Sequence, residues 1–194
     1  MRKGLIILLV CLPGIAAAQR FGGGVVGGIN VSQIDGDSWS GYNKAGLVAG
    51  AFVTTSFHKP WGAQMELRYA AKGSAKVMRA AEPRKIRLQY IEMPLLISYE
   101  FYKVFQAQGG ISLGYLFSSA QNEGDGYVEF DEYEPYELAF NVGLDYRFLE
   151  KLSVNVRFAY SILPISADYS GASFPYADSN NVFTFAFYYR IGNN

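Results

Sequence analysis

The chain has 194 residues, with one cysteine, one histidine and 17 basic residues against 17 acidic ones. This balance excludes the strongly basic surface that nucleic-acid binding requires, so no nucleic-acid partner is expected. The chain holds 15 Tyr, 14 Phe and 21 Gly. Such a composition favours β-strands with aromatic ends and close-packed positions.

The first 18 residues have the order of a Sec signal peptide. Arg2 and Lys3 form a basic start, residues 5–15 are mainly apolar, and Ala16-Ala17-Ala18 supplies small residues for cleavage. The apolar run is shorter than the roughly 20 residues of a transmembrane helix. We predict cleavage after Ala18, which leaves residues 19–194 as a single domain without cysteine.

Four strands are expected in the first half of this domain, over residues 25–33, 47–57, 64–71 and 86–99. The first is rich in glycine, and its two faces cannot be assigned. In the fourth, the alternation of apolar and polar residues is interpreted as slipping near Tyr90 and Ile91. Pro94 cannot donate to a strand ladder, so we predict a bulge there.

Four further strands are expected over residues 107–117, 137–148, 152–162 and 183–191. Their alternation is strict in the last three and weaker in residues 107–117, and it gives each strand one bulky apolar face and one polar face. In residues 137–148 the apolar set is Leu138, Phe140, Val142, Leu144, Tyr146 and Phe148. The polar sets are rich in Gly, Ala and Ser and carry charges of both signs, which suits a narrow barrel interior. We therefore predict an all-β fold, an eight-stranded antiparallel up-and-down transmembrane β-barrel whose apolar faces contact outer-membrane lipid.

The connections between these strands alternate between long and short. The long ones cover residues 34–44, 72–85, 118–135 and 163–181, and the short ones cover residues 58–60, 100–104 and 149–151. Long outer loops and short periplasmic turns are typical of bacterial outer-membrane barrels. The expected location is the bacterial outer membrane, with both termini on the periplasmic side.

A barrel of eight strands is just wide enough to be filled by side chains. We predict an ion-pair network in its lumen, formed by Glu66, Arg68, Glu92, Asp145, Arg147, Arg157 and Arg190. The network is interpreted as a structural plug, with a gated proton or ion path as the alternative.

The third long connection is acidic and contains Glu123, Asp125, Glu129, Asp131, Glu132 and Glu134. The second long connection is basic, with Lys72, Lys76, Arg79, Arg84 and Lys85. These loops either attract each other as solvated segments or present a docking or cation-binding surface to an envelope protein partner.

An enzyme is not expected, because His58 is the sole histidine and falls in a predicted periplasmic turn. A catalytic site of the Ser-His-Asp type needs histidine near its nucleophile. No cofactor or metal site is predicted, since ligands of the His or Cys type are almost lacking.

Residues 89–96, QYIEMPLL, resemble the Y-x-E-x-P-L-L stretch of the PorT-like outer membrane protein β-barrel family of Bacteroidetes. Residues 110–116 resemble its G-x-x-x-G-Y-L strand, and residues 187–191 are similar to its last strand. The final Gly192-Asn193-Asn194 departs from the terminal aromatic residue of that pattern. The resemblance implies an outer-membrane barrel and, for some relatives, service in the type IX secretion system.

Three functional hypotheses follow from these features. The first is a non-enzymatic outer-membrane barrel with a structural or partner-binding role in the cell envelope, within an assembly such as the type IX secretion system. The second is a small passive porin-like channel. The third is a secreted soluble barrel that binds an apolar ligand.

Overall fold

The computed structural model describes residues 20–37, 41–76, 85–122, 126–129, 132–166 and 178–191. The predicted signal peptide at residues 1–18 lies outside this part of the chain, as do Glu123, Asp125, Asp131, Arg79 and Arg84. The strands found are β1 (Arg20–Asp35), β2 (Lys44–His58), β3 (Trp61–Ala75), β4 (Lys85–Tyr102), β5 (Phe105–Asn122), β6 (Tyr127–Glu129), β7 (Tyr136–Arg147), β8 (Leu152–Ser161) and β9 (Ser179–Ile191). No helix in these ranges is long and apolar enough to cross a membrane.

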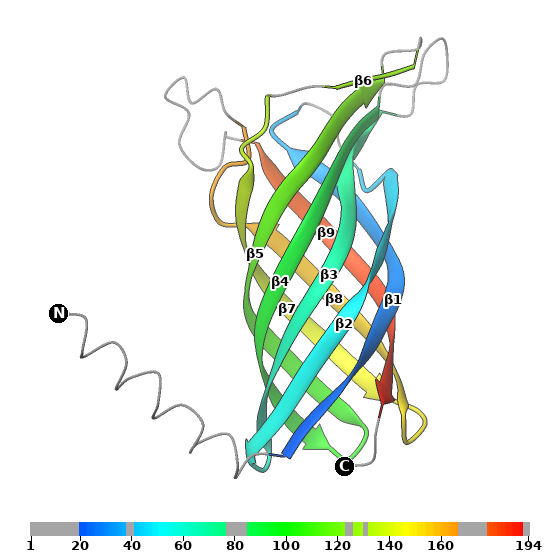
Figure 1. Cartoon of the computed structure of the whole chain (residues 1–194), viewed down its shortest axis with the longest axis vertical. Coiled ribbons are helices and arrows are strands. Elements are labelled where there is room, and N and C mark those ends of the chain that lie inside the picture. The colour runs from blue at the N-terminus through cyan, green and yellow to red at the C-terminus, as the bar shows by residue number, and fades with distance from the viewer. Residues whose placement is uncertain are drawn as a thin grey trace, which may run out of the picture.

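The strands form a closed antiparallel barrel (Figure 1). Their order is β4-β3-β2-β1-β9-β8-β7-β5, and pairing of β4 with β5 closes the ring. The short β6 pairs only with the end of β5. The predicted barrel of eight membrane-spanning strands is therefore confirmed, with β6 as an added hairpin.

Short and long connections lie at opposite ends of the barrel, as predicted. The short ones join β2 to β3, β4 to β5 and β7 to β8, and we call their side the short-turn end. The opposite side is the loop end. Several strands run further toward it than predicted: β3 reaches Ala75 and β5 reaches Asn122. Lys72, expected in the second loop, therefore lies within β3.

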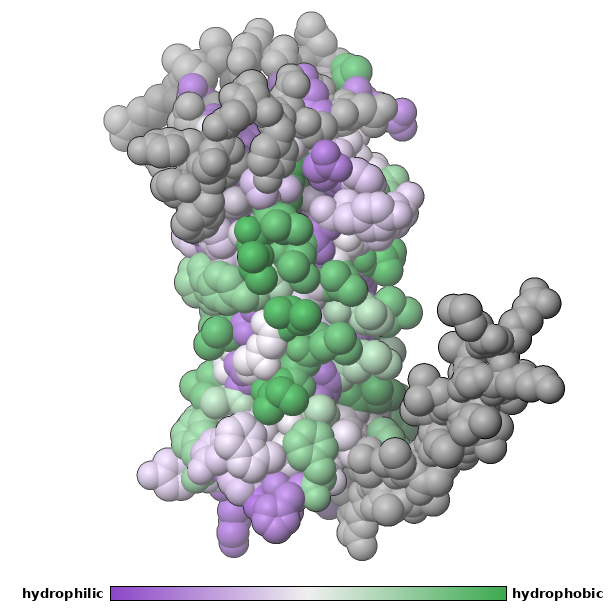
Figure 2. All heavy atoms as spheres, turned by 90° about the vertical axis from the view of Figure 1, so that its left-hand side faces the viewer, coloured by the Kyte–Doolittle hydropathy of each residue, from purple (hydrophilic) through white to green (hydrophobic). Residues whose placement is uncertain are grey.

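Bulky apolar side chains point outward and polar ones point into the lumen. Phe140, Val156 and Phe185 are 37%, 41% and 44% exposed, whereas Arg157 is 0% exposed. Figure 2 shows the resulting band of apolar residues between two more polar ends. This arrangement is the reverse of a soluble barrel and matches a fold whose solvent is lipid.

Two expectations for β4 were wrong. Its alternation is unbroken, so Ile86, Leu88 and Tyr90 point inward in phase with Glu92. The bulge lies in β5 instead, where the pairing partner shifts from Ser118 to Leu116 between Gln89 and Tyr90. Pro94 keeps the register on both sides of it. The apparent slip arose because the lumen is apolar near the loop end, where Ile86, Leu88 and Tyr90 point inward and the polar Lys85, Arg87 and Gln89 point outward. The apolar and polar faces of β4 thus exchange sides near Tyr90.

Aromatic side chains gather at the two ends of the apolar band. Near the short turns, Phe105 stacks on Phe101 at 5.9 Å and on Tyr146 at 4.9 Å between ring centroids. Near the loops, Tyr69 lies 6.2 Å from Phe117. Amphipathic rings prefer the headgroup level of a membrane, so these groups mark the two membrane interfaces.

Candidate functional site

The middle of the lumen is filled by a buried ion pair between opposite walls. Arg157 on β8 donates from both terminal nitrogens to Glu66 on β3, at 3.0 and 2.8 Å. The Tyr188 hydroxyl donates to the same carboxylate at 3.0 Å, and Gln108 accepts from Arg157 at 3.1 Å. A bidentate pair with further hydrogen bonds to both groups is the geometry that makes buried charges tolerable, although the Nε of Arg157 has no partner among the described residues.

From this pair a line of alternating charges runs toward the loop end. Arg68 contacts Glu66 at 3.4 Å and Glu92 at 2.9 Å. Lys72 pairs with Glu92 and lies 2.7 Å from a carboxylate oxygen of Glu137. These three cations and three anions balance, and each is almost completely buried. The line occupies the lumen as a neutral plug.

The structure brings four of the predicted network residues together: Glu66, Arg68, Glu92 and Arg157. Sequence reasoning missed Lys72 and Glu137 as members of the plug. The signal was present, because position 72 continues the inward series 64, 66, 68 and 70 of β3. Likewise, Glu137 begins the inward series of β7.

The loop end is closed by an apolar cluster above the charged plug. Its members are all buried and come from several strands and one loop: Ile34, Ile86, Leu88, Tyr90, Leu116 and Ile165. The backbone of Ile165 is held between two loops, since it accepts from Glu134 at 2.7 Å and donates to Asp178 at 2.9 Å. The loop after β8 therefore caps the lumen.

Acidic residues surround this cap. Burial and the nearby carboxylates of Asp37 and Glu132 raise the pKa of Asp178. Burial and the same acidic group raise the pKa of the Tyr133 hydroxyl. Of the predicted acidic surface, Glu129 and Glu132 are exposed and Glu134 is partly buried. Across the described ranges, no three His, Cys, Asp or Glu side chains are placed to hold a metal ion.

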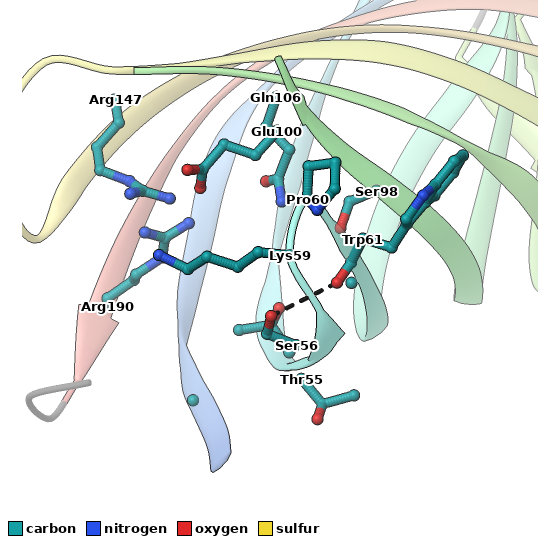
Figure 3. Close-up of a pocket in the computed structure, with 13 residues that line it drawn as sticks. Thr55, Ser56, Lys59, Pro60, Trp61, Ser98, Glu100, Gln106, Arg147 and Arg190 are labelled. Atoms are coloured by element: carbon teal, nitrogen blue, oxygen red, sulfur yellow. Dashed lines mark hydrogen bonds between the residues drawn. The ribbon is translucent and has the colours of Figure 1, made fainter. Parts of the chain in front are cut away.

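The remaining predicted network residues lie apart from the plug, toward the short turns. Asp145 accepts from the Ser153 hydroxyl at 2.9 Å. Arg147 and Arg190 line a cavity of about 570 Å³ at the short-turn end (Figure 3). Within the described chain neither forms an ion pair, in contrast to Arg68 and Arg157. The single predicted network is thus two separate regions.

A closed antiparallel barrel with an apolar exterior and a lumen filled by charged side chains defines a small transmembrane β-barrel protein. Residues 17–167 match the outer membrane protein beta-barrel domain family, and the chain belongs to that family. It is an outer-membrane protein, as predicted. No curated protein matches the chain.

Two solved structures illustrate how far the fold is shared. Ail, the attachment invasion locus protein of Yersinia pestis, was solved with the heparin analogue sucrose octasulfate. It is 13% identical, with a TM-score of 0.54 over 89% of this chain and 99% of that one. Neisserial surface protein A is 8% identical, with a TM-score of 0.59 over 90% and 99%. At these identities the likeness extends to the fold alone.

Proposed function

We propose that this protein is a non-enzymatic outer-membrane barrel with a structural or partner-binding role in the cell envelope, exerted through its loop end. The observation that carries the proposal is the filled lumen. The charged plug around Arg157 and the apolar cluster around Ile165 occupy successive levels of the barrel. This filling argues against a through path for solutes and in favour of function at the two barrel ends.

The loop end offers a partner a charged surface. Glu129 and Glu132 are exposed there, and Glu123, Asp125, Asp131 and Glu134 belong to the same acidic segment. We propose that a basic surface of another envelope protein docks on it, since opposite charges steer association. The resemblance of residues 89–96 to PorT-like proteins supports an assembly of the type IX secretion class.

The test is crosslinking in native membranes followed by mass spectrometry. Replacing the acids at positions 123, 125, 129, 131 and 132 by their amides should remove the crosslinked partner while the barrel still folds. Glu150→Gln is the matched control, because Glu150 is an exposed acid in a short turn, and it should keep the partner. Identical partners in all three proteins would contradict docking on the acidic segment. Type IX components among the partners would support the finer assignment.

The passive-channel hypothesis predicts steady conductance, whereas the filled lumen predicts none. Planar-bilayer recording of the purified protein should give no steady conductance, because a channel would have to pass both the Glu66–Arg157 pair and the cluster around Ile165. Steady openings would replace the partner-binding proposal with a channel. The soluble-carrier hypothesis conflicts with the apolar exterior, so carbonate washing should leave the protein in membranes.

A further inference from the structure

We propose that the cavity at the short-turn end, which the plug closes on its inner side, is a binding site for a phosphate group. The proposal is independent of partner docking at the loop end. The cavity is lined by residues from β1, β2, β3, β4, β5, β7 and β9, so it is the mouth of the lumen and not a surface dent. Its volume of about 570 Å³ falls within the range of about 300–1,000 Å³ found for small-molecule sites.

The cavity exists because several inward-facing positions of β1, β2, β3 and β4 are small at this level of the barrel. Gly22, Thr54, Gly62 and Ser98 line it, whereas the level above is filled by Arg157 and other large side chains. A side chain at position 62 would meet the Ser98 hydroxyl, since an added Cβ would lie 2.9 Å from it. The walls are thus shaped to leave space below the plug.

The cavity carries an excess of positive charge. Arg147, Arg190 and Lys59 line it, and Glu100 is the one acid among its lining residues. Even with the deeper carboxylate of Asp145 included, one positive charge is left over. In Figure 3 the Arg147 and Arg190 guanidinium groups, from β7 and β9, point toward one another, and the Glu100 carboxylate points to the same place. Glu100 is thus one anion beside them, and the excess positive charge leaves a place for a second.

Some polar groups of the mouth also lack partners inside the described chain. The Nε atoms of Arg147 and Arg190 and the hydroxyl of Ser98 are buried without a hydrogen-bond partner there. Buried donors are normally paired. The Nε of Arg157 in the plug is also without a partner, but both Arg68 and Arg157 have carboxylate partners within 3.4 Å, which Arg147 and Arg190 lack among the described residues. A phosphate group, with several acceptor oxygens, fits a ring of guanidinium and hydroxyl donors.

The phosphate can come from a free small molecule or from a lipid headgroup. Trp61 borders the cavity and packs outside the barrel against Tyr99, with ring centroids 4.8 Å apart. Such aromatic pairs lie at the headgroup level, so headgroups and the mouth are at similar depth. The two sources share one chemistry and differ in how they reach the site.

The test uses the full barrel in phosphatidylcholine nanodiscs, in phosphate-free buffer, titrated with glycerol phosphate in a calorimeter. The wild type should show saturable binding at one site. Arg147→Gln with Arg190→Gln should weaken it by at least about tenfold, because both charged donors are removed. Lys103→Gln with Lys151→Gln removes the same charge from exposed turn residues outside the cavity, and should change affinity less than about twofold.

Phosphatidylglycerol nanodiscs distinguish the sources. If a lipid headgroup fills the site, the wild type in phosphatidylglycerol nanodiscs should show no binding of added glycerol phosphate. Nanodisc lipid should then crosslink to the mouth in the wild type and not in the arginine double variant. If a free anion fills it, the titration is unchanged. Far-ultraviolet circular dichroism and heat-modifiable gel mobility establish that both double variants fold. Equal affinity in the arginine variant, or no wild-type binding in either membrane, would overturn the proposal.

Discussion

Lys72 lies between two buried carboxylates and keeps them from repelling each other. Its ammonium group contacts both Glu92 and Glu137, and it is only 2% exposed. Lys72→Met keeps the length of the side chain but leaves these acids without their shared cation. Breaking a buried ion pair from one side costs about 3–5 kcal/mol. We expect the free energy of unfolding, measured by urea titration in lipid vesicles, to fall by about that amount.

Lys76→Met is the matched control for this prediction. Lys76 follows β3 directly and is exposed, so its loss should change stability by no more than about 0.5 kcal/mol. A similar loss in both variants would mean that the charge of Lys72 is not what stabilises the barrel.

The lumen residues show what alternation alone can and cannot predict. It placed Glu66, Arg68, Glu92 and Arg157 on inward faces, and the structure brings them into contact. Pairing between walls depends on height along the barrel, which is set by register between strands distant in sequence. For this reason the sequence groups Arg147 and Arg190 with a plug that they do not join. Lys72 is missed for another reason, because the expected strand ends at residue 71 although its inward series continues to position 72.

At the level of strands, β1 depends on glycine for close contact with β9. Gly28 faces the lumen side, and a Cβ there would lie 2.2 Å from the Phe185 carbonyl oxygen and 2.8 Å from the Ala186 side chain. Gly28→Ala should therefore strain the β1–β9 ladder, which closes the chain's first and last strands on each other. Overpacking of this type costs about 1–3 kcal/mol, to be measured by the same urea titration.

The neighbouring glycine provides the control within the same strand. A Cβ added at Gly27 meets nothing within 4 Å. The free energy of unfolding of Gly27→Ala should therefore stay within about 0.5 kcal/mol of the wild-type value. Equal destabilisation at both positions would show that glycine's backbone freedom, and not close contact with β9, matters in β1.

Strand prediction succeeded where the polar face stays on the lumen side along the strand and was weaker where the polar and apolar faces exchange sides. β7 and β8 alternate strictly because their inward residues are polar along most of their length. In β4, Ile86, Leu88 and Tyr90 are apolar and inward, whereas Lys85, Arg87 and Gln89 on the outer face are polar. Polar and apolar faces thus exchange sides near Tyr90, and periodicity alone interprets that exchange as a slip of the strand.

Across the whole molecule, the lumen has three levels. An apolar cluster lies at the loop end, the charged plug fills the middle, and the cavity opens at the short-turn end. Connector lengths predicted the two ends, because short turns can join only neighbouring strands. They could not predict the cap, since Ile165 is placed by contacts with Glu134 and Asp178 in other loops. The lumen is thus open at the short-turn end and closed at the loop end.

A cysteine placed in this cavity should react with a bulky thiol reagent only from the side of the short turns. Ser56 lines the cavity and is exposed, and Cys11 is the sole cysteine, so Cys11→Ser gives a background for a single cysteine at position 56. With the short turns in the periplasm, a maleimide too large to cross the outer membrane should leave Ser56→Cys unlabelled in intact cells. Permeabilising the outer membrane should then allow labelling.

Glu129→Cys tests the other side in the same background. Glu129 lies in β6 at the loop end and is exposed, so it should be labelled in intact cells without permeabilisation. Ser74→Cys is the buried reference, because Ser74 is 0% exposed near the loop end, and it should resist labelling throughout. Equal labelling of Ser56→Cys before and after permeabilisation would mean either that the lumen is open from loop to turn or that the barrel is inverted. Labelling of Glu129→Cys separates these outcomes, because an inverted barrel would hide that position from the outside.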